Sequence, residues 1–260
     1  MSSAVEQLAK NANWGAFSKA TELKHRILFV LGALLVYRLG TYIPVPGIDP
    51  IVWKEIYSQK GGGILDMLNM FSGGALQRMT IFALNIMPYI SASIIMQLAA
   101  AMSPKLEKLK KEGEHGRMKI NQYTRYLTVL LASVQAYGLA VGLQGMQSSA
   151  GSAVINPGMF FIASTMITIV GGTIFLMWLG EQITQRGIGN GISLIIFAGI
   201  VAELPRAIGS TLELGRQGQF NLIELLALTA MIVGVIVMIV YFERAQRRVL
   251  VQYPKRQQGN

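Results

Sequence analysis

The segment Tyr126–Gly180, YLTVLLASVQAYGLAVGLQGMQSSAGSAVINPGMFFIASTMITIVGGTIFLMWLG, contains no Asp, Glu, Lys or Arg. A helix that crosses a bilayer needs ~20 mostly apolar residues, so this segment is too long for one such helix and long enough for two. Its middle, from Gln144-Gly145 to Asn156-Pro157-Gly158, contains the Gly, Asn and Pro residues that interrupt helices. We therefore predict two membrane-spanning helices joined by a short uncharged loop.

Four more apolar stretches flank this pair, which predicts an all-α polytopic membrane protein with six transmembrane helices. They cover about Ile27–Ile43, the stretch between Arg78 and Lys105, about Ile188–Val201 and about Leu222–Phe242. Arg38 lies in the first stretch, where an arginine is tolerated if its side chain reaches the interface or faces protein. Pro88 lies in the second stretch and is expected to kink that helix, because proline removes a backbone hydrogen bond.

The composition supports a membrane protein, since 52% of the residues are hydrophobic and 14% are charged, against roughly 25% charged in an average soluble domain. A net charge of +10 is also typical of nucleic-acid binding, but Lys and Arg collect in the segments between the apolar stretches, most strongly in every second one. This is the positive-inside pattern, so we expect both termini in the cytoplasm and no direct DNA binding. Cysteine is absent, which excludes disulfides and thiolate metal sites, and we expect no metal or cofactor.

A short segment, GGGILDMLNMFSGG at Gly61–Gly74, has apolar residues at helical spacing between flanking glycines. At ~1.5 Å per residue, such a helix is too short to cross a hydrocarbon core of ~30 Å. It is either an interfacial or loop helix, or a re-entrant element covered by protein or water. The residues alone leave both interpretations open.

No arrangement of residues indicates a catalytic centre or an intramembrane proton relay. The glycine-rich stretch Gly187–Gly191 superficially resembles a phosphate-binding loop but lacks the full fingerprint. Close helix packing through Gly187 and Gly191, four residues apart, explains these glycines better. Gly138 and Gly142 have the same spacing and the same interpretation.

The stretch between Arg78 and Lys105 contains an aliphatic stripe. Ile86, Ile90 and Ile94 recur every four residues and therefore share one helix face, which Gln97 extends. In lipid every helix face is apolar, so the residues alone favour ordinary lipid or helix packing over a functional role for this stripe.

Several longer strings are distinctive in their order and spacing. They are IPVPGID at Ile43–Asp49, NMFSGGAL at Asn69–Leu76, NIMPYISASIIMQL at Asn85–Leu98, KKEGE at Lys110–Glu114, QYTRY at Gln122–Tyr126, MWLGEQITQRGIGNGISLIIFAGI at Met177–Ile200 and QRRVLVQYPKRQQG at Gln246–Gly259. Together they resemble the bacterial SecY family of the Sec protein translocase, over nearly the whole chain. Strings of this length are too specific to match by chance.

The resemblance implies a channel of ten transmembrane helices in two pseudo-symmetric halves, with a lateral gate to lipid and a short re-entrant plug helix that closes the outer funnel at rest. The plug matches the Gly61–Gly74 segment at Ile64, Leu65, Asp66, Met67, Leu68, Asn69, Met70 and Phe71. The aliphatic ring that narrows the family's pore matches Ile86, Ile90 and Ile196. The lateral gate matches Ser91, Ile94 and Gln97.

The function implied by the resemblance involves no covalent chemistry, so the chain is not expected to be an enzyme. It is passage of unfolded polypeptides across the cytoplasmic (inner) membrane, and lateral release of transmembrane segments into the lipid bilayer. Implied partners are SecE, SecG, the SecA motor or the ribosome, signal sequences and nascent polypeptides. The tail resembles the start of a cytoplasmic docking loop, with expected contacts at Arg247, Arg248, Lys255 and Arg256.

The resemblance also implies a division of the chain. Residues 1–26 would form a cytoplasmic segment, residues 27–242 the channel domain and residues 243–260 the start of the docking loop. Because the family's chain continues for four more helices, we expect a truncated sequence or a half that needs a complementary chain. A non-conducting channel half and a secondary transporter of small solutes remain alternatives, although scarce intramembrane charge counts against a transporter.

Overall fold

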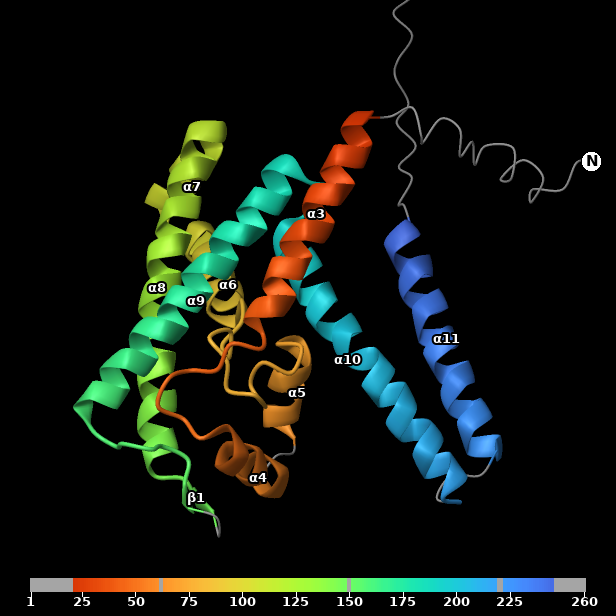
Figure 1. Ribbon diagram of the computed structural model, residues 1–260. Coiled ribbons are helices and arrows are strands. Elements are labelled where there is room, and N and C mark those ends of the chain that lie inside the picture. The colour runs from red at the N-terminus through yellow and green to blue at the C-terminus, as the bar shows by residue number, and fades with distance from the viewer. Residues whose placement is uncertain (1–20, 61–62, 149–150, 219–221, 246–260) are drawn as a thin grey trace, which may run out of the picture. The chain divides into compact units, whose positions relative to one another are not determined.

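The computed structural model describes residues 21–60, 63–148, 151–218 and 222–245, and these are mostly helical (Figure 1). The helices are α3 (Thr21–Gly40), α4 (Pro50–Lys60), α5 (Ile64–Phe71), α6 (Met87–Met102), α7 (Pro104–Lys111), α8 (Glu114–Gln144), α9 (Met159–Arg186), α10 (Gly191–Arg216) and α11 (Leu222–Arg244). The strands β1 (Gln147–Ser148) and β2 (Gly151–Ser152) form an antiparallel hairpin.

Four of the described helices, α8, α9, α10 and α11, are long and apolar enough to cross a membrane. The sequence predicted six transmembrane helices, and four of them meet this criterion of length and apolar composition in the structure. Helix α6 is apolar but shorter, and α3 carries Lys24, Arg26 and Arg38 within its twenty residues. The described part of the chain is therefore an all-α membrane protein with four long apolar helices and several shorter ones.

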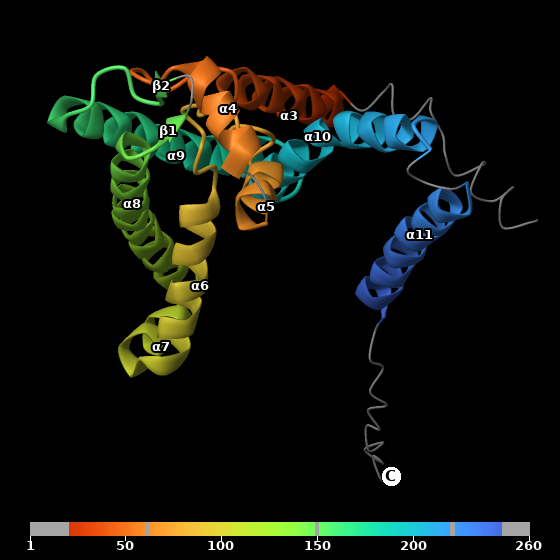
Figure 2. The same ribbon diagram turned by 90° about the horizontal axis from the view of Figure 1, so that it is seen from below.

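The predicted helix pair is confirmed as α8 and α9. Gly145 caps the end of α8, and Gly158 immediately precedes α9, so the break falls within the predicted stretch. Both helices extend beyond the uncharged segment, because α8 begins at Glu114 and α9 ends at Arg186. The charged loop expected before α8 is thus partly helical, and α7 lies at the ends of α6 and α8 (Figures 1 and 2).

Helix α8 packs against α6 and α9 with a stripe of small side chains. The buried members recur every four residues and are Thr124, Thr128, Ala132, Ala136 and Ala140. Small residues allow helix backbones to approach closely where lipid removes the hydrophobic driving force. Gly138 and Gly142 lie outside this stripe, since a Cβ added to either would meet nothing within 4 Å. Among the described residues, neither glycine has the packing role that was predicted for it.

The packing role predicted for Gly187 and Gly191 is confirmed. A Cβ added to Gly187 would lie 2.5 Å from Val30 Cγ2, and one added to Gly191 would collide with the Gly180 carbonyl oxygen. The glycines therefore allow the loop between α9 and α10 to pack tightly against α3 and α9.

Pro88 does not kink a helix, contrary to the prediction. Helix α6 begins at Met87, and Pro88 occupies its first turn. Backbone N–H groups have no intrahelical partner in that turn, so proline is well tolerated there. The preceding residues 79–86 run as turns, which places Ile86 at the cap of α6 instead of within it.

Helix α10 is longer than predicted. It was expected to end near Val201, but it continues through Pro205 to Arg216. Arg206 and Arg216, which follow the predicted end near Val201, therefore belong to a helix. Sequence reasoning ended the helix too early because charged residues and a proline follow the apolar stretch.

The chain forms two compact units, Met1–Leu204 and Pro205–Asn260. In the first unit, one apolar cluster surrounds α4 and includes Trp53, Ile56 and Phe161. A second cluster joins α3, the turns before α6, α9 and the start of α10. In the second unit, α11 exposes its large apolar side chains, as expected of a helix that faces lipid or a partner helix.

Candidate functional site

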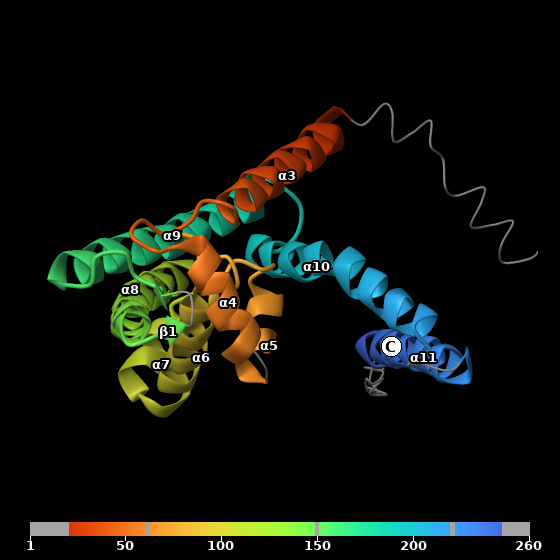
Figure 3. The same cartoon turned by 60° about the horizontal axis from the view of Figure 1, so that its bottom comes forward.

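Helix α5 forms in the short glycine-flanked segment, and its bounds, Ile64–Phe71, are the eight residues matched to a plug. Figures 2 and 3 show α5 lying beside α4. The Tyr57 hydroxyl donates a hydrogen bond of 2.8 Å to Asp66 Oδ1 and so joins the two helices. Burial raises the pKa of the Tyr57 phenol, and the Asp66 carboxylate raises it further, so Tyr57 keeps the proton that it donates.

The C-terminal end of α5 is held by side chains from distant parts of the chain. The last carbonyl groups of a helix have no intrahelical partner and need donors from elsewhere. Asn85 Nδ2 donates to the Phe71 carbonyl oxygen at 2.7 Å. The Tyr37 hydroxyl, fully buried, donates to the Ser72 carbonyl oxygen at 3.4 Å.

Two arginines complete this attachment at the next carbonyl group. Gly73 O accepts hydrogen bonds from Arg38 Nη1 at 2.9 Å and from Arg78 Nη2 at 2.8 Å. Both guanidinium groups also lie over the Tyr42 ring, at 5.2 and 4.4 Å from its centroid. Positive charge at this end of α5 complements the helix dipole. Arg38 thus faces protein, which is one of the two arrangements that the sequence allowed.

We call Tyr37, Arg38, Arg78 and Asn85 the α5 anchor. Sequence reasoning missed Tyr37, Arg78 and Asn85 as a set, because they come from α3 and from the turns before α6. The turn after α5 also lies against α10, where a Cβ on Gly73 would be 3.0 Å from Gly199 Cα. At this point the backbone of the turn lies directly against the backbone of α10.

The predicted ring residues lie next to this attachment. Ile86 is buried, with 1% of its surface exposed, and belongs to the same apolar cluster as half-buried Ile90. The Ile90 amide donates to the Ile86 carbonyl oxygen at 3.1 Å, so the two side chains are one helical turn apart. On α10, Ile195 is fully buried in this cluster, whereas the predicted Ile196 is half-buried and is not one of its members.

The predicted lateral-gate residues lie along α6. Ser91 is half-buried, and 53% of Ile94 is exposed. Gln97 is exposed, and its Nε2 donates to Ser93 Oγ at 3.2 Å. The three residues therefore form a strip of mixed polarity that the first unit leaves partly uncovered.

A polar hollow of about 510 Å³ opens at the junction of α6, α8, α9 and α10. Its lining includes Arg125 and Glu181, which form an ion pair of 2.8 Å between α8 and α9. Asn190 Oδ1 accepts from the Ile192 amide at 3.0 Å and so caps α10. Thr184 Oγ1 accepts from the Gly191 amide at 2.8 Å. These amides are already bonded within the protein, which argues against a phosphate-binding loop.

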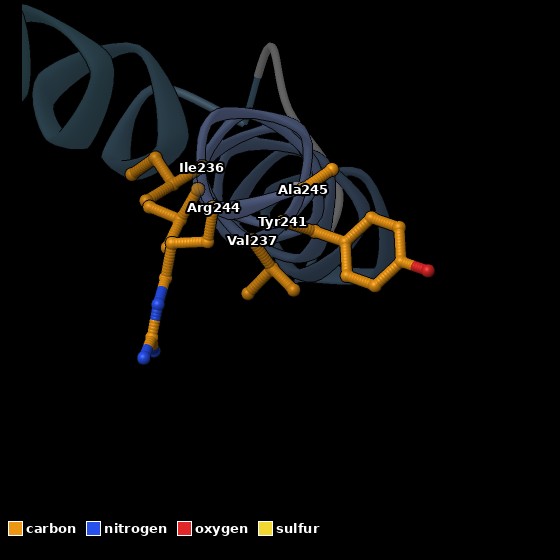
Figure 4. Close-up of a pocket in the computed structure, with 6 residues that line it drawn as sticks. Ile236, Val237, Tyr241, Arg244 and Ala245 are labelled. Atoms are coloured by element: carbon orange, nitrogen blue, oxygen red, sulfur yellow. The ribbon is translucent and has the colours of Figure 1, made fainter. Parts of the chain in front are cut away.

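The predicted docking residues Arg247, Arg248, Lys255 and Arg256 lie outside the described residues. The nearest described part is the end of α11, where Figure 4 shows Ile236, Val237, Tyr241, Arg244 and Ala245 around a hollow of about 690 Å³. All described residues that line it come from α11 and Ala245, just after it. It is therefore an open helix surface, and we assign no site to it.

Comparison with known proteins identifies the family. A sequence profile of the SecY family matches residues 80–260. The protein translocase subunit SecY of Escherichia coli (strain K12) is 57% identical over 238 residues, which cover 92% of this chain and 54% of that protein. The protein translocase subunit SecY of Pseudomonas aeruginosa is 56% identical over 255 residues, which cover 97% of this chain and 56% of that protein.

Solved structures show the same fold at lower sequence identity. Canine Sec61, in a ribosome-channel complex from the endoplasmic reticulum, matches with a TM-score of 0.60 and 20% identity, over 88% of this chain and 50% of that chain. A SecY structure whose plug domain is described as stabilising the closed state of the translocation channel and maintaining a membrane seal matches with a TM-score of 0.57 and 22% identity. That match covers 86% of this chain and 47% of the other.

The chain spans about half the length of the curated relatives that it matches first. Within that span the described helices follow the same fold. This chain is a multi-pass membrane protein that belongs to the SecY family.

Proposed function

We propose that this chain supplies part of a protein-conducting channel, which passes unfolded polypeptides across the cytoplasmic membrane and releases transmembrane segments sideways into lipid. It does no covalent chemistry. The observation that carries the proposal is the direct hydrogen-bonded contact between α5 and the residue before Ile86. A short helix fixed beside an aliphatic constriction is the arrangement that a plugged pore needs.

The constriction would work as a gasket. Branched aliphatic side chains at Ile86 and Ile90 exclude ions from a narrow opening by dewetting it, and they yield around a passing chain because they form no fixed polar contacts. Ile196 is the third position proposed from the resemblance, and its neighbour Ile195 shares the buried cluster of Ile86. The remaining ring positions would come from outside this sequence.

The plug would be α5, and the lateral gate would include Ser91, Ile94 and Gln97. The contacts of α5 include the hydrogen bond from Tyr57 of α4 and those of the α5 anchor. Such contacts can be exchanged at modest cost, because a typical net hydrogen bond contributes about 0.5–1.5 kcal/mol. The mixed polarity of the gate strip suits contact with both a signal sequence and lipid.

The proposed topology has six transmembrane helices, with α3 and α6 added to the four long ones, and both termini in the cytoplasm. It is supported by the excess of Lys and Arg in residues 1–26, 105–125 and 243–260. Residues 27–242 would form the channel domain. SecE and SecG subunits, and SecA or a ribosome bound near Arg247, Arg248, Lys255 and Arg256, are the partners proposed from family membership.

The experiment that tests this function is resting ion conductance of the full-length protein, assembled with its partner chains in a planar bilayer. Replacing Ile86 and Ile90 with glycine is expected to raise the conductance at least several-fold, because the gasket loses its side chains. Ile95→Gly is the matched control, since it lies on α6, is exposed and belongs to neither the proposed ring nor the proposed gate. Equal conductance in the parent and the Ile86→Gly/Ile90→Gly variant would argue against a gasket at these positions.

A further inference from the structure

We propose that the hydrogen bond from Asn85 to Phe71 couples the constriction to the plug, so that outward movement of Ile86 releases the last turn of α5. This inference rests on the proposed function and deepens it, because it names the residue that links the two moving parts. Asn85 would be a positioning residue that acts through its neighbours.

The geometry at Asn85 is specific. Asn85 immediately precedes Ile86, the cap of α6, and is 2% exposed. Its backbone has φ = +49°, in the left-handed region that asparagine and glycine adopt more readily than other residues. This conformation belongs to the backbone turn that leads into Ile86, and from it the amide reaches the Phe71 carbonyl oxygen at 2.7 Å.

Stability alone does not account for an asparagine here. Asn85 Oδ1 is buried and has no hydrogen-bond partner among the described residues. An unsatisfied buried acceptor is unfavourable by roughly as much as a single hydrogen bond is favourable. Glycine would allow the same backbone without leaving this oxygen unpaired, so the amide is best explained by the contact that its nitrogen makes with α5.

The other members of the α5 anchor lie further along the chain from the proposed constriction, although Tyr37 shares the buried cluster of Ile86. Tyr37 and Arg38 belong to α3, and Arg78 lies seven positions before Asn85 in the chain. Only Asn85, among the four, is adjacent to a proposed ring residue. A hydrogen bond of 2.7 Å is lost beyond about 3.5 Å. A shift of roughly 1 Å at Ile86 therefore suffices to break it.

The test uses a cysteine reporter on α5 in the full-length protein, assembled with its partner chains in proteoliposomes. These 260 residues contain no cysteine, so Met70→Cys, at a position that is 44% exposed, adds one thiol to this part of the protein. Its labelling rate with a membrane-permeant maleimide measures release of the helix. The rate is measured at rest and with a stalled polypeptide that carries a signal sequence.

Asn85→Gly removes the amide but keeps the left-handed backbone. We expect it to speed labelling at rest by roughly 5- to 10-fold, the effect of losing one hydrogen bond. We also expect the stalled polypeptide to cause no further increase. Tyr57→Phe is the control, because it weakens the contact of α5 with α4 while leaving Asn85 intact. It should keep the increase on addition of the polypeptide.

The inference is overturned if Asn85→Gly labels at the parent rate at rest, or if the polypeptide speeds its labelling by the same factor as in the parent. A parent protein that does not respond to the polypeptide contradicts the proposed function instead. In that case the resting rate of Asn85→Gly still decides whether this amide holds α5 in place.

Discussion

Gly199 is a residue of α10 that packs directly against the turn after α5. A Cβ added there would lie 2.8 Å from the Phe71 carbonyl oxygen and 3.0 Å from the Tyr37 hydroxyl oxygen. Both neighbours are constrained, one as backbone and the other by complete burial. The position therefore requires a residue without a side chain, for reasons of space.

Gly199→Ala is accordingly expected to destabilise the full-length protein by about 1–3 kcal/mol, the usual effect of an added methyl group in a packed region. Thermal unfolding in detergent measures this. Gly138→Ala, in α8, is the matched control, because a Cβ at Gly138 meets nothing within 4 Å. An equal loss of stability in both variants would contradict the close approach of α10 to the α5 turn.

Arg38 illustrates what a single residue in a sequence leaves open. An arginine within an apolar stretch either reaches the interface or faces protein, and both arrangements satisfy its charge. Its hydrogen bond to Gly73 O selects the second. The sequence could not indicate this choice, since Gly73 lies 35 residues away and meets Arg38 only in the folded chain.

Between elements, α4 and α5 are joined by the Tyr57–Asp66 hydrogen bond, whose strength varies with pH. The folded protein raises the pKa of the Tyr57 phenol above its ordinary value of ~10. A raised pKa means that folding favours the protonated phenol. The stabilisation is therefore complete below pH ~10 and is lost as the pH rises above it.

We expect the melting temperature of the full-length protein in detergent to fall as the pH rises above about 10, and to fall less steeply in Tyr57→Phe. At neutral pH the variant should lose about 0.5–1.5 kcal/mol, the net contribution of one hydrogen bond. Parallel pH profiles for the two proteins would show that Tyr57 does not carry this dependence. Tyr123→Phe, at an exposed tyrosine, controls for general tyrosine titration.

Helices α8 and α10 show the limits of reading element boundaries. Hydropathy located both helices. The predicted bounds were too short, however, because charged residues occur in the first turns of α8 and in the second half of α10. Pro88 begins a helix that it was predicted to kink, and Pro205 lies within α10, beyond the end predicted for that helix. Composition determines whether a segment is apolar, whereas the hydrogen bonds that extend a helix past polar residues depend on local backbone geometry.

For the whole molecule, the proposed topology gives a direct test with single cysteines in a chain that otherwise has none within these residues. Glu112→Cys, in the exposed turn between α7 and α8, should face the cytoplasm. Ile155→Cys, 63% exposed in the loop between α8 and α9, should face outward. An impermeant maleimide applied to intact cells with the outer membrane permeabilised should label only Ile155→Cys. Labelling of Glu112→Cys in sealed cells would invert the topology.

The sequence by itself determined the membrane class, the positions of the main helices, the break between α8 and α9, and the short helix at Ile64–Phe71. These follow from the distribution of apolar residues, charge and glycine along the chain, which are local properties. Only the tertiary structure brought Tyr37, Arg38, Arg78 and Asn85 together around the end of α5 and selected the stripe of Thr and Ala for packing on α8. Those choices depend on which backbones approach one another, because unpaired carbonyl groups and close helix contacts are satisfied by residues far apart in the sequence.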